Sequence, residues 1–194
     1  FYRGGGLLIP LYIYLSDEYN VFFTNEKVEM DFNISNFIIE RLQLSHEKVP
    51  SPEEIFYYVY GILHSNIYRL KYDEFLGIDY PRIPFTANRE LFEKILRFGK
   101  RLANLHLLKS KELDNPTVKF KGQGEDMKVE RRRFNEELER LYINKDYYFE
   151  GVSPEIWEFQ IGGYQVMDKY LKDRKGRQMD DPRHYIHIAT AIEK

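Results

Sequence analysis

Three short segments of the chain carry closely spaced lysine and arginine side chains, the groups that neutralise phosphates in protein–nucleic acid contacts. In chain order they are Lys119 and Lys121; Lys128, Arg131, Arg132 and Arg133; and Lys169, Lys172, Arg174, Lys175 and Arg177. A single charge run is most often a solvated surface, which is the simpler interpretation of each segment alone. Because all three follow residue 118 in a chain of formal net charge −2, together they predict one electropositive face.

The third basic segment belongs to the sequence IGGYQVMDKYLKDRKGRQ, residues 161–178. The pattern predicts a strand end, a turn at Gly162 and Gly163, and a helix from about Tyr164. Backbone N–H groups at a helix start can bind a phosphate, and glycines allow a nucleic acid backbone to approach closely. Tyr164 and Gln165 are therefore candidate contact residues beside the basic side chains.

A glycine motif, FKGQG at residues 120–124, is similar to a short motif with which some methyltransferases hold S-adenosylmethionine. That use requires a helix after the glycines, whereas the residues that follow alternate as a strand does. The Asn-Pro-Pro motif followed by Tyr or Phe, which amino-methyltransferases need, is also absent from the sequence. A hairpin turn is the better interpretation.

Other patterns that could support catalysis or metal binding are incomplete. The glycines at residues 4–6 lack the lysine and hydroxyl residue of a P-loop. His184 and His187 have a permissible metal spacing, but no suitable third ligand stands near them in the sequence. No cysteine is present, and no serine lies in a nucleophile-elbow context. We expect no catalytic, cofactor-binding or metal-binding residues in this chain.

The bulk properties suit one folded domain over residues 1–194. The absence of cysteine excludes disulfides and agrees with a reducing, cytoplasmic location. No apolar run approaches the length of a membrane span, so no membrane partner is expected. The chain begins with Phe1 and not with Met, and has no signal-peptide layout, from which we expect a fragment of a longer protein. We expect this fragment to be monomeric.

The first half of the chain predicts strands followed by long helices. Residues 7–32 indicate two or three strands, with Pro10 at an edge or an interruption. A short helix is expected from Asn33, and a second from the capping pattern at Ser51 to about Leu70. A proline-rich extended segment then leads to a long helix that begins at Asn88. The apolar side chains expected to face the core of these helices are Ile34, Phe37, Ile38 and Leu42; Phe56, Val59, Leu63, Ile67 and Leu70; and Leu91, Ile95, Phe98, Leu102 and Leu105.

The second half has shorter patterns. Residues 113–150 indicate a β-hairpin excursion, and residues 155–161 alternate as a strand with Trp157, Phe159 and Ile161 on one face. Two short helices are expected to close the chain, the second opened by Asp181 and Pro182. The predicted class is α+β, a single mixed domain with central long helices packed on antiparallel or mixed strands.

Several long phrases resemble the C-terminal specificity domain of single-polypeptide restriction–modification enzymes, the Type ISP enzymes and related large adenine methyltransferases. They are SPEEIFYYVYGILHSNIYRLKYDEFLGIDYPRIPF, LFEKILRFGKRLANLHLL and EIWEFQIGGYQVMDKYLKDRKGR, with GGGLLIPLYIYL before them and HYIHIATAIEK after them. A helix, an extended RIPF and a second helix are also distantly similar to Type I specificity-subunit recognition domains.

The resemblance implies a non-catalytic target recognition module that holds duplex DNA against a methyltransferase core of the same polypeptide. S-adenosylmethionine, methylation and cleavage would then belong to other domains. The basic residues named above other than Lys128, together with Tyr164 and Gln165, would contact DNA. An alternative is a protein-interaction domain whose basic face docks an acidic partner without DNA. A weaker alternative is an enzyme that binds S-adenosylmethionine through FKGQG. Salt-dependent binding to duplex DNA separates the first two possibilities.

Overall fold

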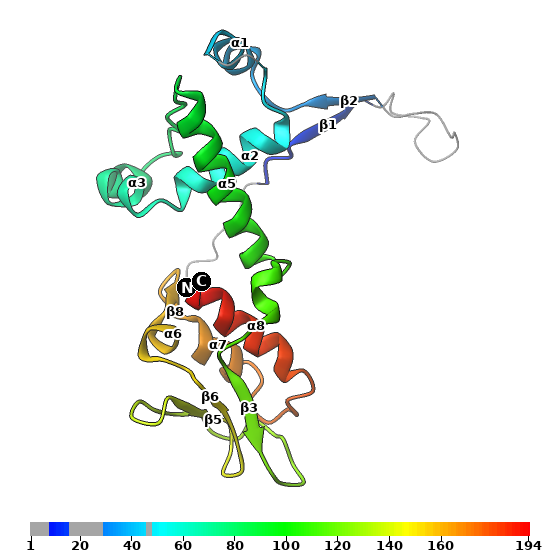
Figure 1. Cartoon of the computed structure of the whole chain (residues 1–194), viewed down its shortest axis with the longest axis vertical. Coiled ribbons are helices and arrows are strands. Elements are labelled where there is room, and N and C mark those ends of the chain that lie inside the picture. The colour runs from blue at the N-terminus through cyan, green and yellow to red at the C-terminus, as the bar shows by residue number, and fades with distance from the viewer. Residues whose placement is uncertain (1–7, 16–28, 46–47) are drawn as a thin grey trace. The chain divides into compact units, whose positions relative to one another are not determined.

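The computed structural model describes residues 8–15, 29–45 and 48–194, which form helices and antiparallel sheets (Figure 1). The predicted α+β class is confirmed. The chain divides into two compact units, Phe1–Ala103 and Asn104–Lys194. The glycines at residues 4–6 lie outside the described residues. Within the described part, no helix combines the length and apolar character of a membrane span.

The first unit contains a strand pair and a set of helices. Its elements are β1 (Tyr12–Leu15), β2 (Glu29–Phe32), α1 (Asn36–Ser45), α2 (Pro52–Leu63), α3 (Asn66–Lys71), α4 (Asp73–Leu76) and α5 (Arg89–His106). Strands β1 and β2 pair in antiparallel fashion, which confirms two predicted strands. The predicted helix start at Asn33 is wrong, because α1 begins at Asn36 and the Asn33 side-chain amide donates to the Pro10 carbonyl at 2.8 Å.

Helix α2 begins as predicted, with a capping box between Ser51 and Glu54. It does not continue to Leu70, because the chain turns after His64 and Ser65 caps the separate helix α3. The turn changes which side chains are buried. Ile55 and Tyr58 enter the core, whereas the predicted core residues Phe56, Ile67 and Leu70 are exposed, as is Phe37 of α1.

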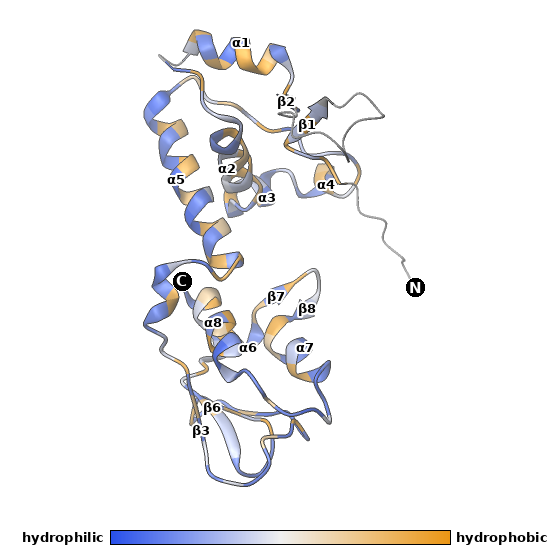
Figure 2. Ribbon diagram, turned by 90° about the vertical axis from the view of Figure 1, so that its right-hand side faces the viewer, coloured by the Kyte–Doolittle hydropathy of each residue, from blue (hydrophilic) through white to orange (hydrophobic). Residues whose placement is uncertain are grey.

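Helix α5 starts at the predicted cap, where the Asn88 side chain accepts from the Leu91 amide at 2.9 Å. Apolar and polar residues alternate along it (Figure 2), but Leu91 and Phe98 are exposed and Phe92 is buried. The reason is that α2 and α5 approach each other closely at two glycines, Gly61 of α2 and Gly99 of α5. A Cβ on Gly99 would lie 1.8 Å from the Tyr57 carbonyl oxygen, so the helix must turn this glycine side toward α2. Near this contact, the Tyr58 ring stacks on two others, Phe85 of the extended segment and Phe92 of α5.

The second unit is built on a four-stranded sheet. Its elements are the 3-10 helix η1 (Lys111–Asp114), β3 (Lys119–Gly122), β4 (Arg133–Asn135), β5 (Arg140–Tyr142), β6 (Tyr147–Glu150), α6 (Pro154–Glu158), β7 (Gln160–Ile161), β8 (Tyr164–Gln165), α7 (Val166–Lys172) and α8 (Pro182–Glu193). The strand order is β3-β6-β5-β4, and every pair is antiparallel. Helices α6, α7 and α8 gather on one side of this sheet (Figure 1).

The segment 113–150 supplies a large part of the second unit's core, so it is an integral sheet and not an excursion. Its second part, which the sequence indicated as strand, forms a hairpin of two strands, β5 and β6. The prediction of a hairpin turn at FKGQG is wrong, because β3 pairs with β6 and not with the strand that follows it. Leu141 and Phe149 are fully buried, and Phe120 and Phe134 pack beside them.

The predicted strand over residues 155–161 is also wrong, since most of it is helix α6. The Ser153 hydroxyl accepts from the Ile156 amide at 3.4 Å, and Pro154 occupies the first helical turn. Serine followed by proline is a helix-start signal that outweighs three alternating apolar residues. Helix α8 begins as predicted, with the Asp181 carboxylate accepting from the His184 amide at 3.0 Å.

Tyr185 of α8 joins the helices beneath the sheet. Its ring packs on Phe149, and its hydroxyl donates to the Met167 carbonyl of α7 at 2.9 Å. Burial raises the pKa of this tyrosine well above its ordinary value of 10.0. The phenol therefore stabilises the fold fully below pH ~10, and that contribution is lost as the pH rises toward the higher folded-state pKa.

We predict that Tyr185→Phe lowers the free energy of unfolding at neutral pH by about 1–3 kcal/mol, because the Met167 carbonyl loses its donor. Above pH ~10 the variant should lose stability with pH less steeply than the wild type. Denaturant unfolding at several pH values measures both effects. Tyr164→Phe is the matched control, since Tyr164 is 64% exposed, and it should change neither quantity. Equal alkaline slopes for Tyr185→Phe and wild type would contradict the prediction.

Candidate nucleic-acid interface

Two of the predicted basic segments lie side by side in the second unit. The Val129 amide donates to the Arg177 carbonyl at 2.9 Å, and the Gly176 amide donates to the Val129 carbonyl at 2.8 Å. A third bond joins the Met179 amide to the Met127 carbonyl at 3.0 Å. The loop after α7 and the segment before β4 thus form a backbone-bonded pair, which we call the basic loop pair (residues 126–131 and 174–179).

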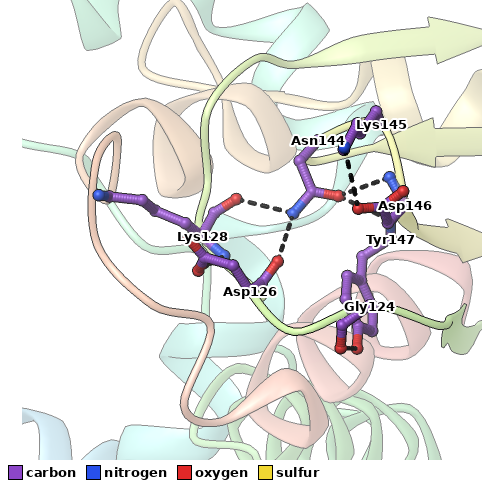
Figure 3. Close-up of polar contacts among 7 residues, drawn as sticks. All are labelled: Gly124, Asp126, Lys128, Asn144, Lys145, Asp146 and Tyr147. Atoms are coloured by element: carbon purple, nitrogen blue, oxygen red, sulfur yellow. Dashed lines mark hydrogen bonds and ion pairs between the residues drawn. The ribbon is translucent and has the colours of Figure 1, made fainter.

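Asn144 lies in the turn between β5 and β6 and holds the first segment of the basic loop pair in place (Figure 3). Its side-chain amide donates to the carbonyls of Asp126 and Lys128, each at 3.0 Å. Its side-chain oxygen accepts from the amides of Asp146 at 2.9 Å and Tyr147 at 2.7 Å. Asn144 is 7% exposed, so a buried polar group with a full set of partners determines the path of this loop.

Some of the predicted contact residues are held within the protein. Arg132 forms an ion pair with Asp168 of α7, at 2.5 Å between Nε and Oδ1, and this pair links the two basic segments. Lys169 pairs with Asp173, and the side-chain N–H groups of Lys169 lower the pKa of that carboxyl. The Arg174 guanidinium lies 3.5 Å from the centre of the Tyr170 ring.

Other cations of the basic loop pair are more available for contact. Lys128, Arg131, Lys175 and Arg177 are exposed. They form no ion pair with any residue in the described ranges 8–15, 29–45 and 48–194. Lys172 is also exposed, at the end of α7. Exposed cations on adjacent backbone segments can contact phosphates of a polyanion without first breaking an internal pair.

The predicted helix begins at Val166, two residues after Tyr164, and Gln165 is its N-cap residue. Tyr164 and Gln165 lie directly before this helix. They form β8, which pairs with β7 through a two-residue turn at Gly162 and Gly163. Both glycines have positive φ, 57° and 78°, as a tight hairpin turn of this kind requires. Tyr164 is exposed, whereas the Gln165 side chain donates to the Trp157 carbonyl. The residues that we predicted as a phosphate site thus form a hairpin that leads directly into α7.

Lys119 and Lys121 lie on β3, at the edge of the sheet opposite β4. Lys121 pairs with Glu150 of β6, and Glu150 also accepts from Arg140 of β5 at 2.8 Å. The Lys121 and Arg140 side chains hold the pKa of the Glu150 carboxyl below its ordinary value, so it is ionised at neutral pH. Among the described residues, no three His, Cys, Asp or Glu side chains converge as metal ligands would.

Comparison with known families identifies the chain. The family model described as the Type ISP C-terminal specificity domain matches residues 1–194. The chain belongs to this family. A Type ISP specificity domain is a recognition domain and not a catalytic one. The comparison with curated proteins gave no significant match.

Three solved structures share the fold of this Type ISP specificity domain. The ATP-dependent Type ISP restriction-modification enzyme LlaBIII bound to DNA matches with a TM-score of 0.66 and 20% identity, over 94% of this chain and 12% of that chain. A DrdV–DNA complex matches with a TM-score of 0.65 and 21% identity, over 85% and 19%. A nuclease-deletion mutant of the Type ISP enzyme LlaGI, in complex with a DNA substrate mimic, matches with a TM-score of 0.56 and 21% identity, over 74% and 13%. This chain thus spans less than a fifth of each of these proteins.

Sequence reasoning missed four residues of this specificity domain that shape its basic surfaces: Arg140, Tyr142, Asn144 and Tyr148. Arg140, Tyr142 and Tyr148 alternate with buried residues on β5 and β6, so the strand period was a usable signal. Asn144 stands between the two strands in a turn-like sequence, INKDYY, that resembles many solvated turns. Its burial depends on a loop far away in the sequence, which no local pattern reveals.

Proposed function

We propose that this chain is the target recognition module of a restriction–modification enzyme and binds duplex DNA through its basic surfaces. Membership of the Type ISP specificity family supports the role. The observation that carries the proposal is the basic loop pair, in which backbone bonds join two cationic segments far apart in sequence. Lysine and arginine contacts to phosphates would set the position of the module, and polar side chains would distinguish bases.

The rest of the enzyme is proposed to lie in other domains of the same polypeptide. The small share of each similar protein that this chain covers supports this division. On this view a methyltransferase core binds S-adenosylmethionine and modifies adenine, while this chain binds no cofactor and acts as a monomeric module. A cytoplasmic location follows from a role on cellular DNA.

Salt-dependent binding of a fluorescent duplex to the full chain tests the proposal. The logarithm of the association constant should fall linearly with the logarithm of the salt concentration, because each phosphate contact releases counterions. Sequence-independent association should be measurable at low salt. Absence of binding down to low salt would contradict the proposal and favour a protein-interaction domain. Calorimetry with S-adenosylmethionine should show no heat.

A further inference from the structure

The four-stranded sheet has one face packed on the core and one face free of the helices of its own unit. Alternation along the strands points Phe120, Phe134, Leu141 and Phe149 to the core. The alternate residues form two rows across the strands on the other face, which we call the outer sheet face. The first row is Lys121, Tyr148, Tyr142 and Arg133, and the second is Lys119, Glu150, Arg140 and Asn135.

Both arginines of the outer sheet face lie on tyrosine rings. The Arg133 guanidinium is 4.7 Å from the centre of the Tyr142 ring, and Arg140 is 4.6 Å from that of Tyr148. The two rings are in contact, with centres 5.2 Å apart. A guanidinium stacked on a ring keeps its N–H donors at its edge, where a phosphate or a guanine can accept them in pairs. Arg133 can offer such a pair, whereas Arg140 already donates from Nε and Nη2 to Glu150, at 3.2 and 2.8 Å. Stacking also reduces the side-chain freedom that binding would otherwise remove.

The charge of the outer sheet face is positive but not uniform. Four cations, Lys119, Lys121, Arg133 and Arg140, surround one carboxylate, Glu150. Glu150 accepts from Lys121 and Arg140 on both sides. Arg133 makes no ion pair with the described residues, whereas Arg140 pairs with Glu150. The charge of Arg133 is therefore less neutralised than that of Arg140.

We propose that the outer sheet face is a second duplex-DNA contact surface of this chain, with Arg133 and Arg140 as phosphate or base-edge ligands and Glu150 as a restraint on binding to arbitrary DNA. This inference rests on the proposed function and extends it. A carboxylate placed between two cations repels phosphates unless the duplex is seated so that the arginines reach their acceptors. A surface for neutral or cationic partners would not concentrate stacked arginines and lysines in this way.

The location also connects the basic surfaces of the second unit. Arg133 ends the segment that contains Lys128 and Arg131 of the basic loop pair, and β4 continues it into the sheet. The row from Arg133 then reaches Lys121 on the far edge strand. The three predicted basic segments are thereby joined through two residues that the sequence did not single out, Tyr142 and Tyr148, with Arg140 in the neighbouring row.

Arginine-to-glutamine substitutions test the surface in the full chain by duplex binding over a range of salt. Arg133→Gln and Arg140→Gln should each reduce the salt slope by about one and weaken binding roughly 5- to 10-fold at ~0.1 M salt. Arg133→Lys should retain most of the slope. Lys111→Gln is the charge-matched control, because Lys111 lies on η1, which packs against α8 on the other side of the sheet, and it should leave the slope unchanged.

Glu150→Gln gives a result of opposite sign. It removes the single carboxylate of the face and should strengthen binding to a duplex of arbitrary sequence by roughly fivefold. Weaker or equal binding by a folded Glu150→Gln variant would overturn the role given to Glu150. If this variant or Arg140→Gln unfolds, Arg133→Gln decides the proposal, since Arg133 has no ion pair to lose among the described residues.

The outcomes separate this inference from the proposed function. In one outcome the wild-type chain binds duplex DNA, and Arg133→Gln and Arg140→Gln have the same salt slope of binding as the control Lys111→Gln. The outer sheet face is then not a DNA surface, and the proposed function stands. If the wild-type chain binds no duplex at low salt, the proposed function itself fails, and this inference fails with it. A face that instead binds an acidic protein would give the first of these results.

Discussion

Replacing Lys175 and Arg177 together with glutamine is expected to weaken binding to duplex DNA by roughly 10²-fold at ~0.1 M salt. Both side chains are exposed on the second segment of the basic loop pair, and neither forms an ion pair with the described residues. The salt slope should fall by about two, because two phosphate contacts are lost. Arg174 is a poorer choice for this test, since its guanidinium is stacked on Tyr170.

Fluorescence anisotropy of a labelled duplex, titrated at several salt concentrations, gives both the affinity and the slope. The matched control is Lys109→Gln with Lys111→Gln, which removes the same charge from exposed positions between α5 and β3. The control should follow the wild type closely. If both double variants show the same slope, general charge and not the basic loop pair is responsible for binding.

Asn144→Ala is expected to lower the free energy of unfolding by about 3 kcal/mol. The substitution removes four part-buried hydrogen bonds and leaves the backbone groups of two loops without these partners. A fully buried group without a partner costs about 1–3 kcal/mol, and water compensates for part of that cost here. The segment from Asp126 to Lys128 should lose its fixed path, so its amide hydrogens should exchange faster. Binding to duplex DNA should weaken too, since the basic loop pair is no longer ordered before contact.

Denaturant unfolding and amide hydrogen exchange measure these effects of Asn144→Ala. Asn135→Ala is the control, because among the described residues the Asn135 side chain accepts from the Leu138 amide alone, at 3.0 Å, in an exposed turn. Its cost should be about 1 kcal/mol, with unchanged exchange in residues 126–128. Equal costs for the two variants would show that the Asn144 network does not hold the loop.

Local signals predicted the parts of the fold that depend on local chemistry. The caps at Ser51, Asn88 and Asp181 lie where the sequence placed them, because a side-chain oxygen acts on an amide three residues away. Tertiary contacts decided the rest. Phe98 and Ile67 fit a helical apolar stripe but are exposed, since the glycine contact of α2 with α5 and the turn after α2 select other faces.

The candidate interface was predictable in composition but not in arrangement. Lysine and arginine clusters indicated the candidate segments, yet no local pattern shows that residues 126–131 and 174–179 are hydrogen-bonded neighbours. It also could not show that Arg132 is committed to Asp168. The strand register was needed to show which residues lie between the clusters in space, namely Arg140, Tyr142 and Tyr148.

Selection of bound duplexes from a randomised pool is the measurement that tests target recognition most directly. The full chain is incubated with the pool at moderate salt, where sequence-independent phosphate contacts are weakened. Recognition of a target predicts that one short sequence is enriched and that its duplex competes at least 10³-fold better than an arbitrary one, as is typical of specific DNA binding. Retention of all sequences alike, or of none, would contradict the account of this chain as a target recognition module.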